Sequence, residues 1–209
     1  MTAATLDLDA LRRAPTTREP FPYFIVPGFV KKEALEGIEK DYPALDKPGS
    51  FPLDTVSYGP AFDQLMKDLR GPEFRDLVAQ KLNCDLKGRP TMVTVRGQTR
   101  ARDGQIHTDS KTKLVTVLLY MNGQWEAPGG RLRLLRSPDN LNDIIEEVPP
   151  VAGTLLVFTN TPNAWHGHEP FEGKRRTIQL NWVRDQGVVL REQLRHRVSA
   201  FFKRLKKAA

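Results

Sequence analysis

The segment Arg175-Arg-Thr-Ile-Gln-Leu-Asn-Trp-Val183 decides the fold, because its side chains alternate in character with the two-residue period of a β-strand. One face is polar and the other, after its first residue, is apolar: Arg175, Thr177, Gln179 and Asn181 against Arg176, Ile178, Leu180 and Trp182. We therefore expect the polar face to line a pocket and the apolar face to pack against helices, with Arg176 pointing outward or lying near the rim.

The chain after about residue 90 consists of short β-type runs that turn signals such as Asn122-Gly123 and Ser137-Pro138 separate. These runs are residues 91–96, 105–108, 113–120, 131–135, 144–148, 154–159 and 175–183, and a further one lies at 21–26. Strands at this spacing indicate a sandwich or a barrel.

Helical periodicity marks the first half of the chain and its C-terminus. Apolar residues recur at helical spacing in residues 31–42, 60–69 and 73–82, and again after about residue 188. We expect one domain over residues 1–209 of class α+β. It has a helical support at about 30–85, a β-sandwich at about 90–185 and a basic, amphipathic C-terminal helix at about 188–207.

Composition excludes several classes of protein. The single cysteine, Cys84, rules out an intrachain disulfide and a C-x-x-C zinc or redox site. The N-terminus lacks the apolar core of a signal peptide, and no apolar run reaches the roughly 18 residues of a membrane span. A cytoplasmic location is the prediction that follows.

The net charge of +7 belongs almost wholly to the C-terminus. Eight basic and two acidic residues between Arg184 and Lys207 contribute +6, so the rest of the chain carries only +1. Nucleic-acid binding by the whole chain is therefore not implied. Three interpretations of the C-terminal helix stay open: it packs its apolar face on the sandwich, it meets anionic lipid with Phe201 and Phe202 at the interface, or it binds nucleic acid, which charge alone favours.

A metal site is indicated by Gly104-Gln-Ile-His107-Thr-Asp109, because residues two apart in a strand point to the same side. A third ligand would come from Asn163-Ala-Trp-His166-Gly-His168, so His166 and His168 are both candidates. Two histidines and one carboxylate form the facial triad of non-haem iron(II) oxygenases. Against this, an H-x-D triplet is common by chance, and a histidine in a strand is usually an ordinary packed or surface residue.

The surrounding pattern resembles the 2-oxoglutarate/Fe(II)-dependent oxygenase superfamily, in particular its prolyl-4-hydroxylase-like branch. The resemblance lies in His107-Thr-Asp109, in His166 as a distal histidine, and in Arg175 nine residues after it. Val115-Thr-Val-Leu-Leu-Tyr120-Met-Asn122, Gly129-Gly130-Arg-Leu132 and Pro20-Phe-Pro-Tyr-Phe-Ile-Val-Pro-Gly-Phe29 are also similar to family segments. The resemblance covers roughly residues 20 to 183.

The resemblance implies a double-stranded β-helix (jelly-roll) core with iron(II), 2-oxoglutarate and O2, and leaves room for ascorbate as an accessory cofactor. His107, Asp109 and His166 would hold the metal. Arg175 and Tyr120 would hold the far carboxylate of 2-oxoglutarate, with Thr177 on the same face. We prefer His166 to His168 and Arg175 to Arg176. The implied reaction is hydroxylation of an unidentified substrate, with conversion of 2-oxoglutarate to succinate.

The region before the H-x-D departs from the family pattern, because many relatives have a tyrosine there and this chain has none. It has Arg96, Arg100 and Arg102 instead, with Lys111 and Lys113 nearby. These residues either face an anionic substrate, small-molecule or peptidyl, or form a solvated basic loop. Two other functions stay open: a cupin-like metal-binding protein that does not use 2-oxoglutarate, and a non-catalytic binding module that acts through the basic C-terminal helix.

Overall fold

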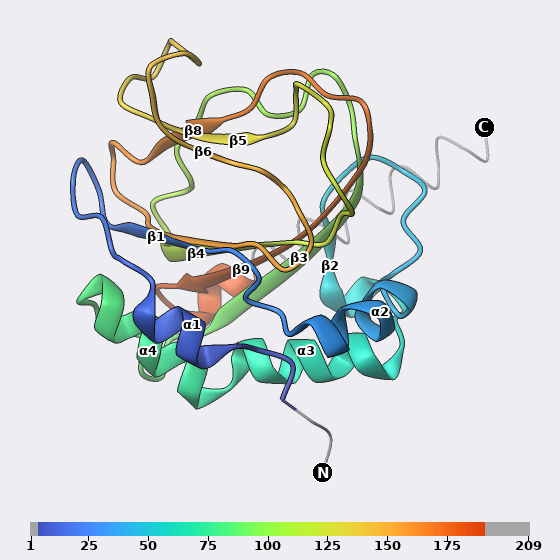
Figure 1. The fold of residues 1–209 in the computed structure, drawn as a ribbon. Coiled ribbons are helices and arrows are strands. Elements are labelled where there is room, and N and C mark those ends of the chain that lie inside the picture. Colours follow the sequence, from blue (N-terminus) through green and yellow to red (C-terminus); the bar gives the residue numbers. More distant parts are fainter. Residues whose placement is uncertain (1–3, 191–209) are drawn as a thin grey trace.

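The computed structural model describes residues 4–190, which form two β-sheets and a layer of helices (Figure 1). The helices are α1 (Leu8–Arg13), α2 (Lys32–Lys40), α3 (Pro60–Arg70) and α4 (Pro72–Leu82), with a short 3-10 helix at Leu53–Thr55. The strands are β1 (Tyr23–Val26), β2 (Phe51–Pro52), β3 (Thr91–Thr99), β4 (Lys113–Tyr120), β5 (Leu132–Leu135), β6 (Ile144–Val148), β7 (Leu155–Thr159), β8 (Trp165–Gly167) and β9 (Gly173–Val183).

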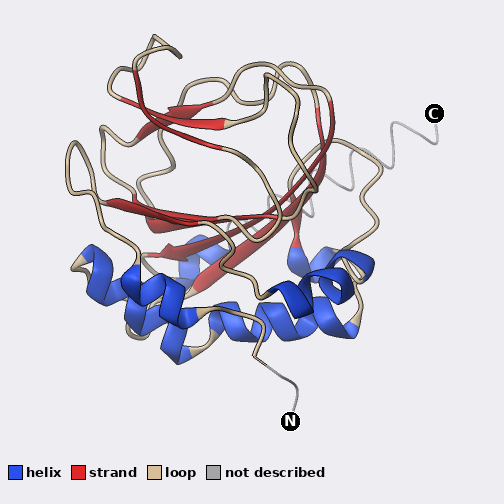
Figure 2. Ribbon diagram, viewed as in Figure 1, coloured by secondary structure: helices blue, strands red, loops and turns tan. Residues whose placement is uncertain are grey.

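The two sheets face one another. The larger sheet has the order β1-β7-β4-β9-β3-β2, the smaller one has the order β6-β5-β8, and all these strand pairs are antiparallel. Figure 2 shows helices α1 to α4 gathered below the larger sheet, while the smaller sheet lies above its opposite face. The jelly-roll type of fold that the sequence predicts is thus present.

The helix-side core joins the larger sheet to the helices, and it follows from the two-residue period of the strands. Ile178, Leu180 and Trp182 of β9 all point into it and are almost fully buried. The Trp182 ring lies 6.0 Å from that of Phe74 in α4. Burying one side chain of this size stabilises the fold by about 1.5–3 kcal/mol, so the predicted apolar face of 175–183 anchors the helices.

The inter-sheet core lies between the two sheets and is confined to one side of that space. Its buried members are Phe21, Tyr23, Leu118, Tyr120, Leu132, Leu134, Val148, Leu156, Phe158 and Ala164. None of them comes from β9 or β3, whose residues facing the smaller sheet are mostly polar. The space above β9 and β3 is therefore left for a site.

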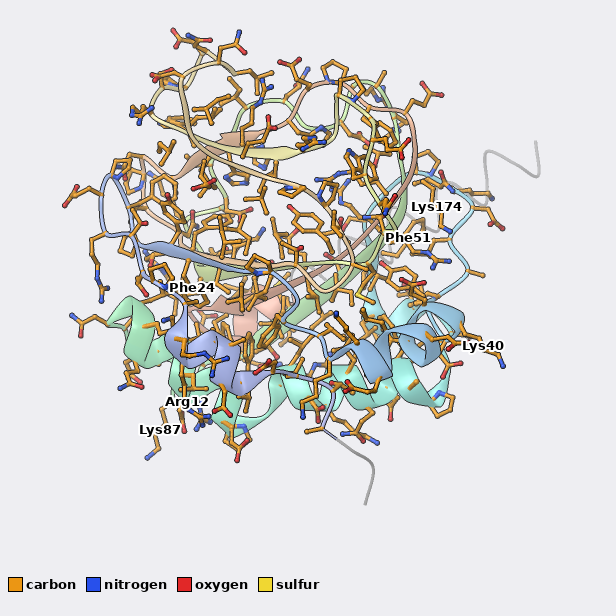
Figure 3. All side chains as sticks on the ribbon, in the orientation of Figure 1. Arg12, Phe24, Lys40, Phe51, Lys87 and Lys174 are labelled. Carbon is orange, nitrogen blue, oxygen red and sulfur yellow. The ribbon has the colours of Figure 1, made fainter. Side chains whose placement is uncertain are left out.

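The helical layer forms where the sequence predicts it, and its ends have local causes. Both α3 and α4 begin with proline in the first turn, where the missing N–H costs no helical hydrogen bond. Gly71 ends α3 and precedes α4, and Asn83 ends α4 in the left-handed conformation with φ 54°. Arg12 and Lys40 extend from this layer into solvent, and Lys87 does so from the turn after α4 (Figure 3).

Three outcomes differ from the sequence predictions or lie beyond the described residues. The strand expected at 105–108 is wrong: only His107 there forms an isolated bridge, to His166. Helix α1, the two-residue β2 and the strand β8, which carries His166, were not expected. Of the C-terminal helix, residues 186–190 are helical and 191–207 lie outside the described residues.

None of the helices within residues 4–190 is long and apolar enough to cross a membrane. The cytoplasmic location and the single domain over the full length stay predictions.

We predict that Gly97→Ala in β3 destabilises the fold, because the new Cβ would lie 2.5 Å from the backbone oxygen of Leu45. Overpacking of this kind costs about 1–3 kcal/mol. The free energy of unfolding in urea measures the effect. Gly123→Ala is the matched control, since a Cβ there meets nothing within 4 Å. Equal stability of the two variants would contradict the packing of residue 45 against β3.

Candidate active site

Three predicted ligand residues lie together at one edge of the space between the sheets. One ligand atom from each of His107, Asp109 and His166 lies within 4.8 Å of the other two. The backbones of His107 and His166 exchange two hydrogen bonds of 3.0 Å, and their ring centroids are 4.3 Å apart. The irregular segment carrying His107 is thus fixed to β8, and the pair brings both imidazoles to one place.

The ring nitrogens of the two histidines have defined roles. His107 Nδ1 lies 2.8 Å from the Gln105 carbonyl oxygen, and His166 Nδ1 lies 2.9 Å from that of Ala164. A carbonyl oxygen only accepts, so each Nδ1 carries the proton and each Nε2 keeps its lone pair. A histidine held in this way is prepared to bind a metal through Nε2.

Asp109 is fixed by a chain of polar side chains that the sequence analysis did not foresee. Lys113 Nζ contacts Oδ1 at 2.6 Å, and the Thr116 hydroxyl donates to Oδ2 at 2.5 Å. Thr116 Oγ1 accepts in turn from the Asn181 amide at 2.8 Å. Alternation along β4 could have revealed Thr116, because it lies four residues before Tyr120 and so shares its face.

The electrostatics keep Asp109 and His166 in the forms that bind a cation. Burial alone would raise the pKa of Asp109, but the charge of Lys113 and the hydrogen bonds from Lys113 and Thr116 outweigh it and hold that pKa below its usual range. Burial, together with the neighbouring His107, lowers the pKa of His166 to about 4. At neutral pH the site thus presents one carboxylate and an uncharged imidazole at His166.

The cavity beside these residues has a volume of about 450 Å³ and a floor made of three adjacent strands. In β3, β9 and β4 the side chains on this face form three cross-strand rows: Arg96–Thr177–Tyr120, Thr94–Gln179–Leu118 and Met92–Asn181–Thr116. Asp109 is bound at the third row through Thr116, whereas Arg175 lies at the first row. The predicted polar face of 175–183 therefore does line a pocket.

Arg175 and Tyr120 bring unpaired polar atoms into the cavity. Arg175 is 5% exposed; its Nε donates to the Gly130 oxygen at 2.8 Å and its Nη1 to Thr177 Oγ1 at 3.4 Å. Arg175 Nη2 and the Tyr120 hydroxyl are buried without a hydrogen-bond partner among residues 4–190. Burial raises the pKa of Tyr120, so its hydroxyl stays protonated and can donate. These two hydrogen-bond donors without partners, together with the positive charge of the Arg175 guanidinium, fit an anionic ligand.

The Gly129-Gly130 pair explains how Arg175 is aimed. A Cβ on Gly129 would collide with the backbone oxygen of Pro170, and one on Gly130, where φ is +77°, would lie 2.8 Å from the Trp125 ring. Only glycines let this loop approach residues 169–171 so closely. The approach places the Gly130 carbonyl where it accepts from Arg175 Nε.

The structure places the alternative ligand residues, His168 and Arg176, and the basic residues near the H-x-D segment in different surroundings. His168 lines the cavity but falls outside the metal-binding cluster found among the described residues. Arg176 lies on the helix side, where its guanidinium is 4.9 Å from the Tyr42 ring. Of the five basic residues, Arg96 and Lys113 line the cavity, whereas Arg100, Arg102 and Lys111 are exposed.

A jelly-roll that gathers two histidines and an aspartate over a cavity with a buried arginine has the features of a non-haem iron(II) oxygenase. Residues 97–184 match the sequence model of the 2OG-Fe(II) oxygenase superfamily. This segment is similar to that superfamily, whose members use Fe(II), 2-oxoglutarate and O2 and act on small-molecule or peptidyl substrates.

Solved structures share the fold. A prolyl-4-hydroxylase from Pseudomonas putida matches with a TM-score of 0.56 and 20% identity, over 79% of this chain and 87% of that one. Prolyl 4-hydroxylases from Phytophthora capsici match with a TM-score of 0.57 and 18% identity, over 87% and 66% of the respective chains. HygX from Streptomyces hygroscopicus, with nickel and 2-oxoglutarate bound, matches with 0.56 and 14%, over 81% and 87%. No curated protein sequence matches this chain.

We predict that Thr116→Val weakens iron(II) binding by about tenfold or more, as loss of a group that orients a metal ligand commonly does. The change preserves shape but removes the 2.5 Å hydrogen bond to Asp109 and the acceptor of Asn181. Anaerobic calorimetric titration with iron(II) measures the dissociation constant. Thr17→Val, at an exposed position far from the site in sequence, is the control. An unchanged constant would show that Thr116 does not position Asp109.

Proposed function

We propose that this chain is a hydroxylase in which His107, Asp109 and His166 bind iron(II) and in which Arg175, Tyr120 and Thr177 bind 2-oxoglutarate. One observation carries the proposal: the orphaned Arg175 Nη2 and Tyr120 hydroxyl share a cavity with the three ligand residues. The reaction is R–H + O2 + 2-oxoglutarate → R–OH + succinate + CO2, in which the cosubstrate supplies the two further electrons.

Each residue has a separate task in this reaction. The two imidazole Nε2 atoms and the Asp109 carboxylate would hold the metal. Bound iron(II) supplies the redox chemistry with O2. Arg175 and Tyr120 donate hydrogen bonds to the far carboxylate and so fix how deeply 2-oxoglutarate enters, while Thr177 supports the Arg175 guanidinium. Leu118 and Leu132 add apolar wall that limits water beside the reacting groups.

The cupin-like alternative would need the metal ligands but would have no use for Arg175. Burying an arginine with an unpaired nitrogen costs stability, so a binding protein without an anionic ligand gains nothing from it. Its presence in the cavity favours an enzyme that uses a dicarboxylate. The substrate is a small molecule or a peptidyl side chain, and ascorbate as an accessory cofactor remains a proposal.

Arg175 and Arg176 are adjacent but lie on opposite faces of β9, so substituting each in turn tests which one binds 2-oxoglutarate. We expect Arg175→Gln to raise the KM for 2-oxoglutarate by about 10- to 100-fold, because a charge-assisted contact with the carboxylate is lost. Arg176→Gln should leave that KM unchanged, since Arg176 contacts Tyr42 and the Glu39 oxygen on the helix side. The assay is O2-dependent succinate formation by the iron-loaded protein.

Asp109→Ala should abolish succinate formation, whereas Asp139→Ala, at an exposed position, should not. Wild-type protein that binds iron(II) yet forms no succinate would favour the cupin-like alternative. Equal KM values for the two arginine variants would show that Arg175 does not hold the cosubstrate.

A further inference from the structure

Arg96 is the basic side chain of the cavity whose charged group has no bonded partner within residues 4–190. Lys113 is paired with Asp109, and Arg175 is bonded to Gly130. The Arg96 backbone oxygen accepts from Tyr42, but its guanidinium makes neither a hydrogen bond nor an ion pair. Arg96 lies in the first cross-strand row, on the opposite side of Thr177 from Tyr120. It thus points into the same cavity as the proposed cosubstrate site, from the neighbouring strand.

The cavity has room on the β3 side rather than on the β4 side. Leu118 and Tyr120 of β4 belong to the inter-sheet core, which fills the space above them. Above β3 the lining consists of Met92, Thr94 and Arg96. Beyond β3 the larger sheet has only the two-residue strand β2 and the isolated bridge between Pro48 and Gln98. A second molecule beside 2-oxoglutarate would therefore lie over β3.

Charge indicates what that molecule carries. The two negative charges of 2-oxoglutarate balance the sum of iron(II), Asp109 and Arg175, so Lys113 and Arg96 remain as excess positive charge. Asp103 also lines the cavity and its charge attracts the Arg96 guanidinium, but its hydrogen bonds come from Arg100, through the backbone N–H at 3.0 Å and the guanidinium at 3.3 Å, and it offsets only one of the two positive charges. A half-buried guanidinium without a partner is stabilised most by an anion that it can grip with two hydrogen bonds.

A second unpaired group lies at the same end of the cavity. The Thr99 hydroxyl, three residues after Arg96 on β3, is buried and lacks a hydrogen-bond partner among the described residues. At the other end of the β3 lining, Met92 packs with Val188 and gives an apolar surface. The β3 side of the cavity is thus polar and cationic at one end and apolar at the other.

We propose that Arg96 binds an anionic group, a carboxylate or a phosphate, on the molecule to be hydroxylated. Thr99 contributes a further hydrogen bond at that end, and the apolar part of the substrate lies against Met92 and Val188. This assignment rests on the proposed function, because it takes the Arg175 end of the cavity as the cosubstrate site. The position of Arg96 would then select anionic substrates over neutral ones.

The test uses the full chain loaded with nickel(II) and saturating 2-oxoglutarate, so that the cosubstrate site is filled and no turnover occurs. Inorganic phosphate is titrated calorimetrically into wild type, Arg96→Gln, Arg96→Lys and Arg102→Gln. We expect Arg96→Gln to raise the Kd for phosphate by about tenfold or more, and Arg96→Lys to raise it less. Arg102→Gln, an exposed arginine outside the cavity, should leave it unchanged. A parallel titration with acetate shows whether the subsite prefers a carboxylate.

The Kd for 2-oxoglutarate, measured on the same proteins, separates the possible failures. It should be unchanged in Arg96→Gln. If it rises as much as the Kd for phosphate, Arg96 belongs to the cosubstrate site and the assignment is overturned. Phosphate that binds Arg96→Gln as well as wild type, or that binds neither, also overturns it. If the wild type itself fails to bind 2-oxoglutarate, the proposed function is wrong and this inference falls with it.

Discussion

The two-residue alternation of β9 is the constraint on which both the core and the site depend. Ile178, Leu180 and Trp182 are held by the helices, so the register that buries them also turns Thr177, Gln179 and Asn181 toward the smaller sheet. A shift by one residue would exchange the two faces and expose the apolar one. The cavity floor is therefore fixed by hydrophobic burial on the far side of the same strand.

Buried polar groups destabilise the fold unless they form hydrogen bonds, and the two ends of the cavity differ in how those bonds are made. Around Asp109 the polar groups bind one another, through Lys113, Thr116 and Asn181. At the other end Arg175 and Tyr120 keep unpaired donors. Buried polar atoms without partners are rare in native structures, so they mark where ligand atoms complete the hydrogen bonding. This contrast separates the part of the site that is preorganised from the part that waits for a ligand.

Much of this arrangement could be predicted from the sequence, because alternation and turn residues define strands locally. The face of 175–183 that lines the cavity and the helices at 31–42, 60–69 and 73–82 follow from periodicity alone. The conformation of 104–109 could not be derived that way: these residues form no strand and are held by the bridge to His166, by the His168 N–H on the Gly104 oxygen, and by the side-chain contacts of Asp109. The sequence also could not predict which half of the inter-sheet space stays open. That depends on how residues far apart in the chain, such as Phe21 and Phe158, fill the other half.

The proposed function requires that iron(II) and 2-oxoglutarate bind together in this cavity. The most direct measurement is an anaerobic titration of the metal-free protein with iron(II) and 2-oxoglutarate, followed by visible absorption. The account predicts a weak charge-transfer band that requires both components and disappears in His107→Ala. Tight iron(II) binding with no band at any concentration of 2-oxoglutarate would contradict it.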